Sequence, residues 1–248
     1  MENSQIYLSV IVPTYNESER INRSLSRISS YLQGQPYTYE ILVVIDGATD
    51  NTPDIARGLE TQIPNLRVID RKKNMGKGYT VREGMLAAKG KIRLFTDADN
   101  STDISYFEKM RPLIDNEYDI AISTRDSKDA EGAGQKIPQS FLKRTLGNMG
   151  NLYIQILAVP GIWDTQNGFK AFKDYAAERI FGMSKINRWA FDVEALALAR
   201  KLGYKIGIIP IQWENDPKSH VSLMGYFKSL LEVAKIRWNL LTGKYNLK

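Results

Sequence analysis

Short apolar segments that alternate with amphipathic helical segments constrain the fold of this chain more than any other feature. The apolar segments at 7–12 and 39–45 are too short for helices and rich in β-branched residues, which is typical of buried strands. Between them, apolar residues recur at steps of four, three and four from Ile21 to Leu32, as on one helix face. This alternation predicts an α/β fold with a mainly parallel sheet and helices on both faces.

The same alternation continues along most of the chain. The predicted strands are 7–12, 39–45, 66–69, 91–96, 118–123, 168–172 and 204–211. The predicted helices are 21–32, 53–60, 77–89, 105–114, 138–158 and 191–202, followed by a helical tail from Ser222. A polar segment at 125–138 interrupts the pattern, and we expect a loop there because further sheet-like segments follow it.

Polar side chains follow three of the predicted strands at the point where each strand ends. They lie at 13–17, 46–50 and 97–99. Ligands of open parallel sheets bind beyond the carboxyl ends of the strands. We therefore expect these three stretches to converge on one rim of the sheet.

Asp97 and Asp99 stand two residues apart at a strand end, so their side chains leave it on the same side. Two like charges this close repel unless a cation lies between them, and a hard divalent cation prefers oxygen ligands. Such a cation keeps positions open for phosphate oxygens. The pair predicts a metal-bound diphosphate; the alternative is that both acids cap the helix that begins near Thr102 or Asp103.

The composition excludes several other kinds of site. The chain has no Cys, which removes thiolate nucleophiles and Cys-based metal sites, and its single His, His220, excludes His-rich zinc sites. Carboxylates must therefore hold any metal. No apolar run approaches the ~20 residues that span a bilayer, and no signal segment precedes the first strand. A net charge of +6 favours anionic partners.

Four polar stretches could bind a ligand, and each could also simply form a turn or a helix cap. The stretch at 13–17 suits a nucleobase, and Asp46 suits a ribose or a base edge. Lys77 between two glycines at a helix start suits a phosphate. The stretch at 164–168 has the donors and acceptors to bind sugar hydroxyls.

Three charged residues and the tail are further candidates. Arg125 and Arg144 could clamp a phosphate by bidentate hydrogen bonds, although a lone surface Arg is usually solvated. Asp192 begins an apolar helix, where it could stabilise the helix dipole or contact acceptor or sugar. The tail has an apolar stripe that we expect to pack on the protein's own core, while its basic residues keep membrane binding open. The stripe comprises Met224, Phe227, Leu231, Ala234, Trp238 and Leu241.

Six ordered motifs run from residue 9 to residue 206 and cover most of the chain. They are SVIVPTYNESERI, VVIDGATDNT, NMGKGYTVREGMLAAKG, LFTDADNST, DTQNGFKAF and WAFDVEALALARKLGYKI. Together they resemble the family 2 glycosyltransferases of the GT-A fold, and more narrowly the dolichyl-phosphate glucosyltransferases, with dolichyl-phosphate mannose synthases as near relatives. Ile45 and Ala48 depart from the acid and the Ser that this family usually has there.

The resemblance implies a GT-A-type fold with a catalytic domain at 1–221 and a basic amphipathic helix at 222–248. It implies a nucleotide-binding half at 1–123 and an acceptor-binding half at 124–221. Asp97 and Asp99 would bind Mg²⁺ or Mn²⁺. The implied nucleotide-binding residues are Pro13, Tyr15, Asn16, Glu17, Asp46, Lys77 and Asp97; Asp164 and Gln166 are candidates for the sugar, and Asp192, Arg125 and Arg144 for catalysis.

The implied reaction is an inverting transfer of a hexose from a nucleotide diphosphate sugar, with UDP-glucose favoured, to a polyprenyl (dolichyl) phosphate. A phosphate monoester is mostly a dianion at neutral pH, because its second pKa is near ~6, so it needs positioning more than deprotonation. We expect a cytoplasmic protein that lies peripherally on a membrane surface.

Other functions remain as alternatives. The donor could be GDP-mannose or a UDP-N-acetylhexosamine, or the acceptor a hydroxyl group in glycan synthesis. A sugar-1-phosphate nucleotidyltransferase would carry an early glycine-rich loop, which is absent, and a non-enzymatic basic protein would not need six site-like stretches. No nucleic-acid-binding module is recognisable, and the sequence does not indicate the oligomeric state.

Overall fold

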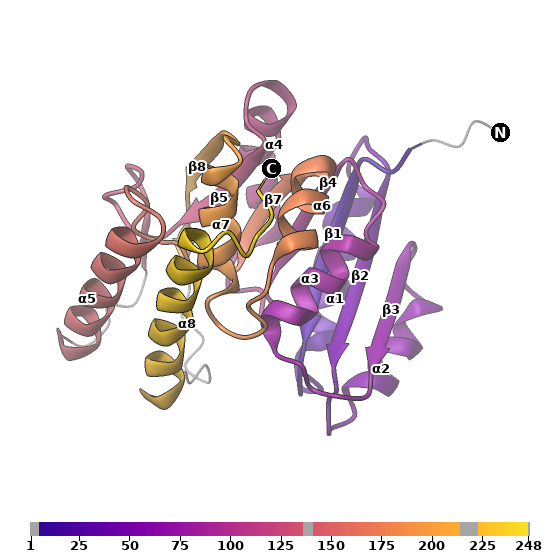
Figure 1. Cartoon of the computed structure of the whole chain (residues 1–248). Helices are drawn as coiled ribbons and strands as arrows, with labels where there is room; N and C mark the ends of the chain where they lie inside the picture. Colours follow the sequence, from indigo (N-terminus) through magenta and orange to yellow (C-terminus); the bar gives the residue numbers. More distant parts are fainter. Residues whose placement is uncertain (1–4, 136–140, 214–222, 248) are drawn as a thin grey trace.

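The computed structural model describes residues 5–135, 141–213 and 223–247, without the side chains of residues 135, 141–146, 223 and 224. Its centre is a seven-stranded sheet in the order β3-β2-β1-β4-β7-β5-β8 (Figure 1). The strands are β1 (Leu8–Thr14), β2 (Tyr39–Asp46), β3 (Leu66–Arg71), β4 (Ile92–Thr96), β5 (Ile120–Thr124), β7 (Phe169–Lys173) and β8 (Ile206–Pro210). All neighbouring pairs are parallel except those of β7 with β4 and β5. The predicted mainly parallel sheet is confirmed.

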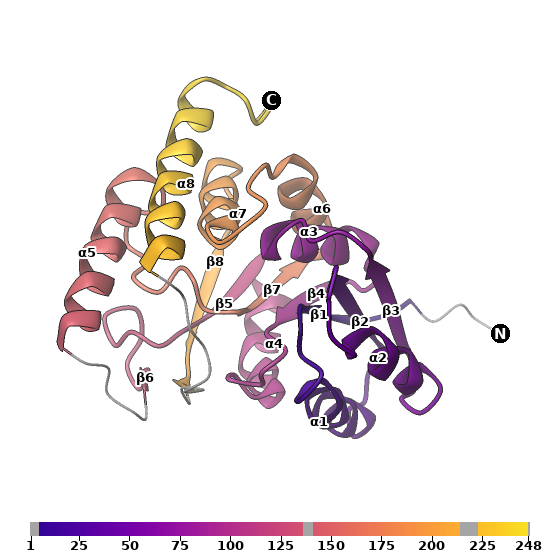
Figure 2. The same cartoon turned by 90° about the horizontal axis from the view of Figure 1, so that it is seen from below.

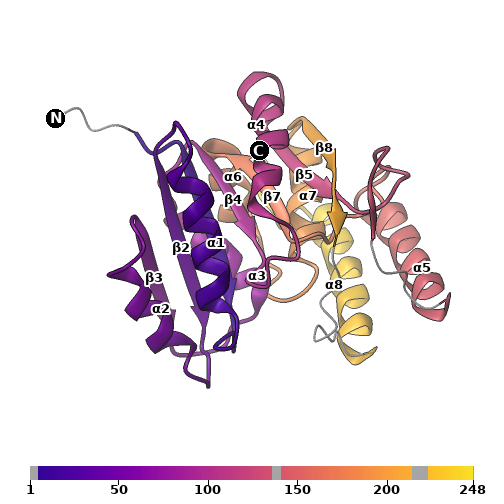
Figure 3. The same cartoon turned by 180° about the vertical axis from the view of Figure 1, so that it is seen from behind.

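Helices cover both faces of the sheet, as the alternating pattern predicts. They are α1 (Ile21–Gln33), α2 (Thr52–Glu60), α3 (Lys77–Ala87), α4 (Phe107–Asn116), α5 (Phe141–Leu157), α6 (Asp174–Met183), α7 (Phe191–Lys201) and α8 (Leu223–Leu241), with a short 3₁₀ helix η1 (Ile104–Tyr106). Figure 2 shows α1, α2 and α4 on one side of the sheet and α3, α6 and α7 on the other, and Figure 3 views the α1 side.

The central strands are buried on both faces, which explains their continuous apolar runs. Along β1, Leu8, Val10 and Val12 belong to the core under α1 and α4, while Ile11 belongs to the core under α3. Each face of the sheet therefore has its own hydrophobic core, and the polar residues are left for the strand ends.

Three details differ from the predicted elements. The predicted strand at 204–211 ends as β8 at Pro210, which has no backbone N–H to donate. A short strand β9 (Gln212–Trp213) then pairs with β6 (Gly134–Gln135) in a separate parallel ladder. Helix α6 is missing from the prediction, because four small or apolar residues inside a short segment are a weak signal. The predicted start of α5 at Pro138 lies outside the described residues.

The expectation that the apolar stripe of α8 packs on the core is wrong. Phe227, Leu231, Trp238 and Leu241 are 61%, 71%, 61% and 67% exposed. Another face of the helix packs instead, since Val233 and Ile236 are fully buried in the core that α7 also joins. Helix α8 is apolar on two faces, and the stripe alone could not tell which of them is covered.

Among the described residues, no helix combines the length and the hydropathy that crossing a bilayer requires.

Candidate active site

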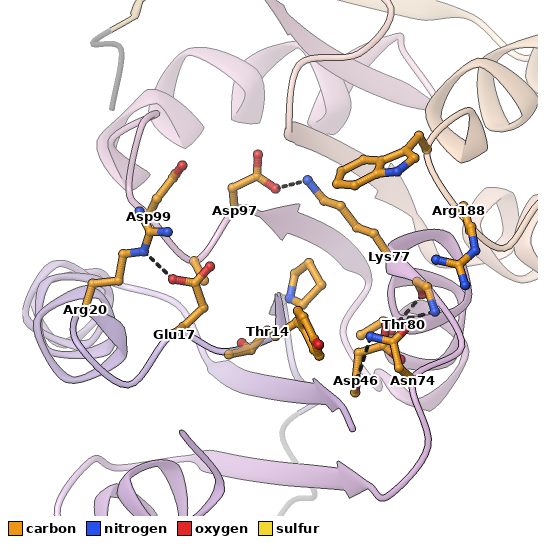
Figure 4. A pocket seen from close by; sticks show the side chains of 15 residues that line it. Thr14, Glu17, Arg20, Asp46, Asn74, Lys77, Thr80, Asp97, Asp99 and Arg188 are labelled. Carbon is orange, nitrogen blue, oxygen red and sulfur yellow. Dashed lines mark hydrogen bonds and ion pairs between the residues drawn. The ribbon is translucent and has the colours of Figure 1, made fainter. Parts of the chain in front are cut away.

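A pocket with a volume of about 350 Å³ opens where the parallel strands end (Figure 4). Its walls come from the loops after β1 and β4, the start of α3 and the loop before α7. Seven residues predicted for donor or metal binding line it: Pro13, Tyr15, Glu17, Asp46, Lys77, Asp97 and Asp99. The three predicted stretches thus meet in one pocket, while the roles of their residues stay predictions.

Asp97 follows β4 directly, and its carboxylate points toward Lys77 (Figure 4). Lys77 Nζ lies 2.6 Å from Asp97 Oδ1, and the two side chains are 30% and 33% exposed. Burial disfavours the charged form of Lys77, but the carboxylates around it, first of all Asp97 and Asp192, outweigh burial and raise its pKa. An ammonium group therefore lies at the point where the sequence predicts a cation.

The alternative role of Asp97 and Asp99 was to cap the next helix, but Asp103 caps it instead. Asp103 accepts a hydrogen bond of 2.9 Å from the backbone N–H of Ser105 at the start of η1. Asp99 accepts one of 2.9 Å from the backbone N–H of Ser101, within its own turn. Asp97 is left facing the pocket, which favours the ligand-binding interpretation.

The carboxylates of this rim fit a divalent cation that arrives together with a ligand. No group of three or more His, Cys, Asp or Glu side chains that could hold a metal occurs in the described part of the chain. Mg²⁺ is usually bound by one or two carboxylates plus substrate phosphates, and Asp97 with Asp99 offers that set. Burial raises the pKa of Glu17, Arg20 opposes the rise, and the charges of Asp99 and Asp97 add to it. The rim therefore concentrates negative charge, as a cation site requires.

Asp46 shapes the glycine-rich turn that begins α3. Its carboxylate accepts hydrogen bonds from the backbone N–H groups of Met75 (2.7 Å) and Gly76 (2.8 Å) and pairs with Arg71. Gly76 has φ +101°, and a Cβ there would lie 2.4 Å from the carbonyl oxygen of Asn187, so the turn requires glycine. Asp46 already serves three donors, so any nucleoside contact shares this carboxylate with the turn.

In the loop after β1, the aromatic residue Tyr15 lines the pocket, whereas the amide residue Asn16 does not. Tyr15 lines the pocket with 46% of its surface exposed, so its ring is accessible to a base. Asn16 is not part of the pocket lining. It accepts a 2.8 Å hydrogen bond from the backbone N–H of Thr49 and thereby joins the loops that follow β1 and β2.

Arg125 and Asp164, the candidates for acceptor phosphate and sugar, form a pair with each other. Arg125 Nε and Nη2 lie 2.8 and 2.7 Å from the two oxygens of Asp164. Burial alone would raise the pKa of Asp164, but Arg125 lowers it below its ordinary value. Gln166 Nε2 lies 3.4 Å from Ser229 Oγ of α8, and the Arg144 side chain lies outside the described residues.

Asp192 forms a second buried pair and does not line the pocket. Lys170 Nζ lies 2.8 Å from Asp192 Oδ1, and the two side chains are 0% and 5% exposed. Burial raises the pKa of Asp192, and Lys170 and Lys77 oppose the rise. The sequence could not reveal this pairing, because β7 and α7 bring together residues 22 positions apart.

The sequence model of glycosyl transferase family 2 matches residues 9–181 of this chain. The chain belongs to this family. The dolichyl-phosphate beta-glucosyltransferase ALG5C of Trichomonas vaginalis is 34% identical over 99% of this chain and 75% of its own length. The dolichyl-phosphate beta-glucosyltransferase of Homo sapiens is 33% identical over 97% of this chain and 78% of its own length.

Solved structures share the fold at lower identity. A structure of glucosyl-3-phosphoglycerate synthase from Mycobacterium tuberculosis, in complex with Mn²⁺, UDP and phosphoglyceric acid, superposes with a TM-score of 0.68. It is 18% identical and covers 93% of this chain and 77% of that chain. S. aureus TarS in complex with UDP-GlcNAc gives a TM-score of 0.58 at 21% identity, over 93% of this chain and 66% of that chain. The predicted GT-A fold is confirmed.

Several pocket residues of this glycosyltransferase were not predicted, and three of them have charged or aromatic side chains. Arg20, Arg188 and Trp189 line the pocket, and Figure 4 shows Arg20 across the pocket from Lys77 and Arg188 on the same side as Lys77. Arg20 pairs with Glu17, so one rim acid has its own cation. Arg188 and Trp189 lie in the loop before α7, and only their position directly before the FDVE stretch hints that they reach the site.

Replacing Asp164 by Ala in this glycosyltransferase should lower the free energy of unfolding by about 3 kcal/mol or more, because it leaves the Arg125 guanidinium unpaired in a largely buried position. Glu117→Ala is the matched control. It removes a surface pair with Lys205, in which both side chains are about 60% exposed, and should cost less than ~1 kcal/mol. Urea denaturation measures both values, and equal losses would contradict the prediction.

The effect of Asp164 should also depend on pH. Since Arg125 lowers the folded-state pKa of Asp164, the pair stabilises the protein above the ordinary Asp pKa of about 3.9. That stability is lost as the pH falls through the lowered pKa. The difference between wild type and Asp164→Ala should therefore shrink in acid, and an unchanged difference would show that charge pairing is not its cause.

Replacing Gly168 by Ala should impair activity more than stability. A Cβ at Gly168 would lie 2.0 Å from Asp97 Oδ2, so the carboxylate must move, and it can swing toward solvent. We expect sugar transfer to fall by about 10-fold or more, as for a misplaced catalytic group. Gly182→Ala is the control, because a Cβ there meets nothing within 4 Å. Thermal unfolding and transfer rates test both, and full activity of Gly168→Ala would refute the expectation.

Proposed function

We propose that this chain transfers a hexose, with glucose favoured, from a nucleotide diphosphate sugar to a polyprenyl phosphate such as dolichyl phosphate, with inversion at the sugar. The observation that carries the proposal is the pocket in which Asp97, Asp99 and Lys77 meet at the strand ends. Relatives that are 33–34% identical over nearly the whole chain and are named dolichyl-phosphate beta-glucosyltransferases support the acceptor and the sugar.

The donor side of the pocket has the charges that a nucleotide diphosphate needs. Lys77, Arg20 and Arg188 bring positive charge to a pocket that also holds the two acids. The exposed ring of Tyr15 supplies a surface for base stacking. UDP-glucose is the donor that we favour, and solved structures of the same fold contain UDP or a UDP-sugar.

Asp97 and Asp99 would hold Mg²⁺ or Mn²⁺ in this reaction. When bound, a divalent cation offsets the negative charge that grows on the leaving diphosphate. Lys77 would donate a hydrogen bond to an oxygen of the same leaving diphosphate, since its Nζ is already in contact with the Asp97 carboxylate. Residues of the chain thus surround the leaving group on two sides.

The acceptor side is built to position a phosphate rather than to deprotonate it. Asp164 fixes the plane of the Arg125 guanidinium through two hydrogen bonds, and Arg125 Nη1 makes no hydrogen bond within the part of the chain that the structure describes. That nitrogen can donate to the acceptor phosphate, and Arg144 is the second candidate. Asp192 is bound to Lys170, so we assign it a smaller role than it would have toward a hydroxyl acceptor.

A donor and acceptor screen tests the proposal. UDP-glucose, GDP-mannose and UDP-N-acetylglucosamine are each incubated with dolichyl phosphate or undecaprenyl phosphate, with and without Mn²⁺, and lipid-linked sugar is measured. We expect glucose on the polyprenyl phosphate only when the metal is present. Transfer to a soluble sugar hydroxyl, with none to either lipid phosphate, would support the hydroxyl-acceptor alternative instead.

A further inference from the structure

Seven of the eleven large hydrophobic side chains that are exposed in the described structure come from only two helices, α5 and α8. They are Met149 (65% exposed), Leu152 (51%) and Ile156 (69%) of α5 and Phe227 (61%), Leu231 (71%), Trp238 (61%) and Leu241 (67%) of α8. We call this set the α5–α8 face. Scattered exposed apolar residues need no explanation, but a cluster of this kind marks an interaction site.

The two helices lie side by side although 65 residues, 158–222, separate them in the chain. All three views place them together beyond β5 and β8, at the end of the sheet opposite β3 (Figures 1, 2 and 3). Glycine permits their close approach, because a Cβ at Gly150 of α5 would lie 2.3 Å from Tyr226 Oη of α8. In Figure 1 both helices extend past the sheet on the side toward which β2 and β3 point, which is also the side of the pocket.

Basic residues flank the apolar residues of α8 on both sides. At about 100° per residue, Phe227, Leu231, Trp238 and Leu241 fall within an arc of about 80°. Lys228 and Lys235 lie at one edge of that arc and Arg237 at the other, and all three are exposed. An apolar stripe that contains Trp and is bordered by Lys and Arg is the composition of a helix that lies in the interface of a membrane.

Negative charge that would oppose such binding is absent from the sequences of both helices except at Glu232. Glu232 faces the protein and accepts hydrogen bonds from the backbone N–H groups of Trp189 (3.1 Å) and Ala190 (3.0 Å). A second copy of the chain would bring an equally basic surface to this face in a twofold dimer. An anionic lipid surface attracts the same charges, so lipid is the partner that the charges favour.

We propose that the α5–α8 face rests on an anionic membrane surface and holds the pocket beside the lipid headgroups. Two contacts tie the face to the site: Glu232 anchors the loop that carries Trp189, and Ser229 meets Gln166. In this orientation the pocket lies beside a phosphate that emerges from the bilayer. The inference deepens the proposed function, since it supplies the surface on which a polyprenyl phosphate is met.

Vesicle flotation tests the inference without any substrate. The protein is mixed with vesicles of phosphatidylcholine alone or of phosphatidylcholine with phosphatidylserine. We expect binding to the mixed vesicles that weakens as salt is added. The double variant Leu231→Glu and Trp238→Glu should bind at least about tenfold more weakly, because two charges replace the apolar contacts. Leu86→Glu, at a 45% exposed apolar residue outside the face, is the control and should bind as the wild type does.

A charge variant and an activity assay make the outcomes distinguishable. Lys228→Glu with Lys235→Glu should lose binding to the phosphatidylserine vesicles while thermal unfolding stays unchanged. Wild-type protein that ignores these vesicles, or double variants that bind them normally, would overturn the inference. A wild-type dimer that Leu231→Glu with Trp238→Glu converts to a monomer, with vesicle binding unaltered, would assign the face to a second copy.

Transfer to a short-chain, water-soluble polyprenyl phosphate separates this inference from the proposed function. The apolar double variant should keep that activity, since neither changed residue lies in the pocket. If vesicles bind but no acceptor is glycosylated, the proposed function fails and the membrane face stands. If short-chain transfer proceeds but vesicles are not bound, only the membrane face fails.

Discussion

Replacing Lys77 by Met should increase the affinity of the protein for Mn²⁺ and at the same time slow hexosyl transfer by about 100-fold or more. The two effects have one cause. Lys77 Nζ lies 2.6 Å from Asp97 Oδ1, so the ammonium group competes with a cation for this carboxylate when no donor is bound. Met has a similar length and no charge, so Asp97 becomes available to the metal while the diphosphate loses a donor.

Two measurements on the same variant check this prediction. Free Mn²⁺ is followed by electron paramagnetic resonance without nucleotide, and transfer is followed as lipid-linked sugar. Lys72→Met is the control, because Lys72 is 81% exposed and pairs with Asp70 outside the pocket. Asp97→Asn should lose both Mn²⁺ binding and transfer. Unchanged Mn²⁺ affinity in Lys77→Met would show that the lysine does not compete with the metal.

Replacing Lys170 by Met should lower the free energy of unfolding by about 3–5 kcal/mol, because the Asp192 carboxylate then stays buried without its cation. Lys170 is completely buried, and its Nζ lies 2.8 Å from Asp192 Oδ1. The double variant Lys170→Met with Asp192→Leu should recover much of the loss, since apolar residues of similar volume often replace a buried ion pair without penalty. Urea denaturation of the two variants and the wild type measures the recovery.

The same double variant decides the role of Asp192. We expect it to retain more transfer activity than Asp97→Asn, because a phosphate acceptor needs little help from a base. Activity as low as that of Asp97→Asn in a folded, donor-binding double variant would make Asp192 a catalytic group. If the double variant is no more stable than Lys170→Met, contacts of Asp192 other than the pair with Lys170 must also stabilise the protein.

Sequence reasoning located most of the residues that line the pocket, because they follow parallel strands. The apolar runs identified β1, β2 and β4, and the carboxyl ends of parallel strands must share one edge of the sheet. Asp97 and Asp99 follow from this rule alone. Asn16 shows its limit: the residue lies in the right loop, but it bonds Thr49 rather than lining the pocket.

The surroundings of the acceptor candidates could not be predicted in the same way, because pairing between residues far apart in the chain decides them. Asp164 meets Arg125 across 39 residues, and only the folded chain shows that each of these two candidates binds the other. Arg188 and Trp189 lie in a loop without periodicity, and only the motif that begins at Trp189 marks their position in the sequence. The antiparallel direction of β7 could not be predicted either, since parallel and antiparallel strands can have the same apolar pattern.

The reversed β7 has a consequence for how such enzymes can diversify. Phe169, its first residue, pairs with Thr96, the last residue of β4, so the segment before β7 ends against Asp97. The loop at 159–168 therefore reaches the pocket with its C-terminal end. The loops that follow β1, β2 and β4 reach it with their N-terminal ends. Residues of this loop other than Asp164 and Gly168, which contact Arg125 and Asp97, can be exchanged without disturbing the β1, β2 and β4 loops. Grafting residues 159–168 from another family member, with Asp164 and Gly168 kept, should then alter acceptor or sugar choice and leave nucleotide choice intact.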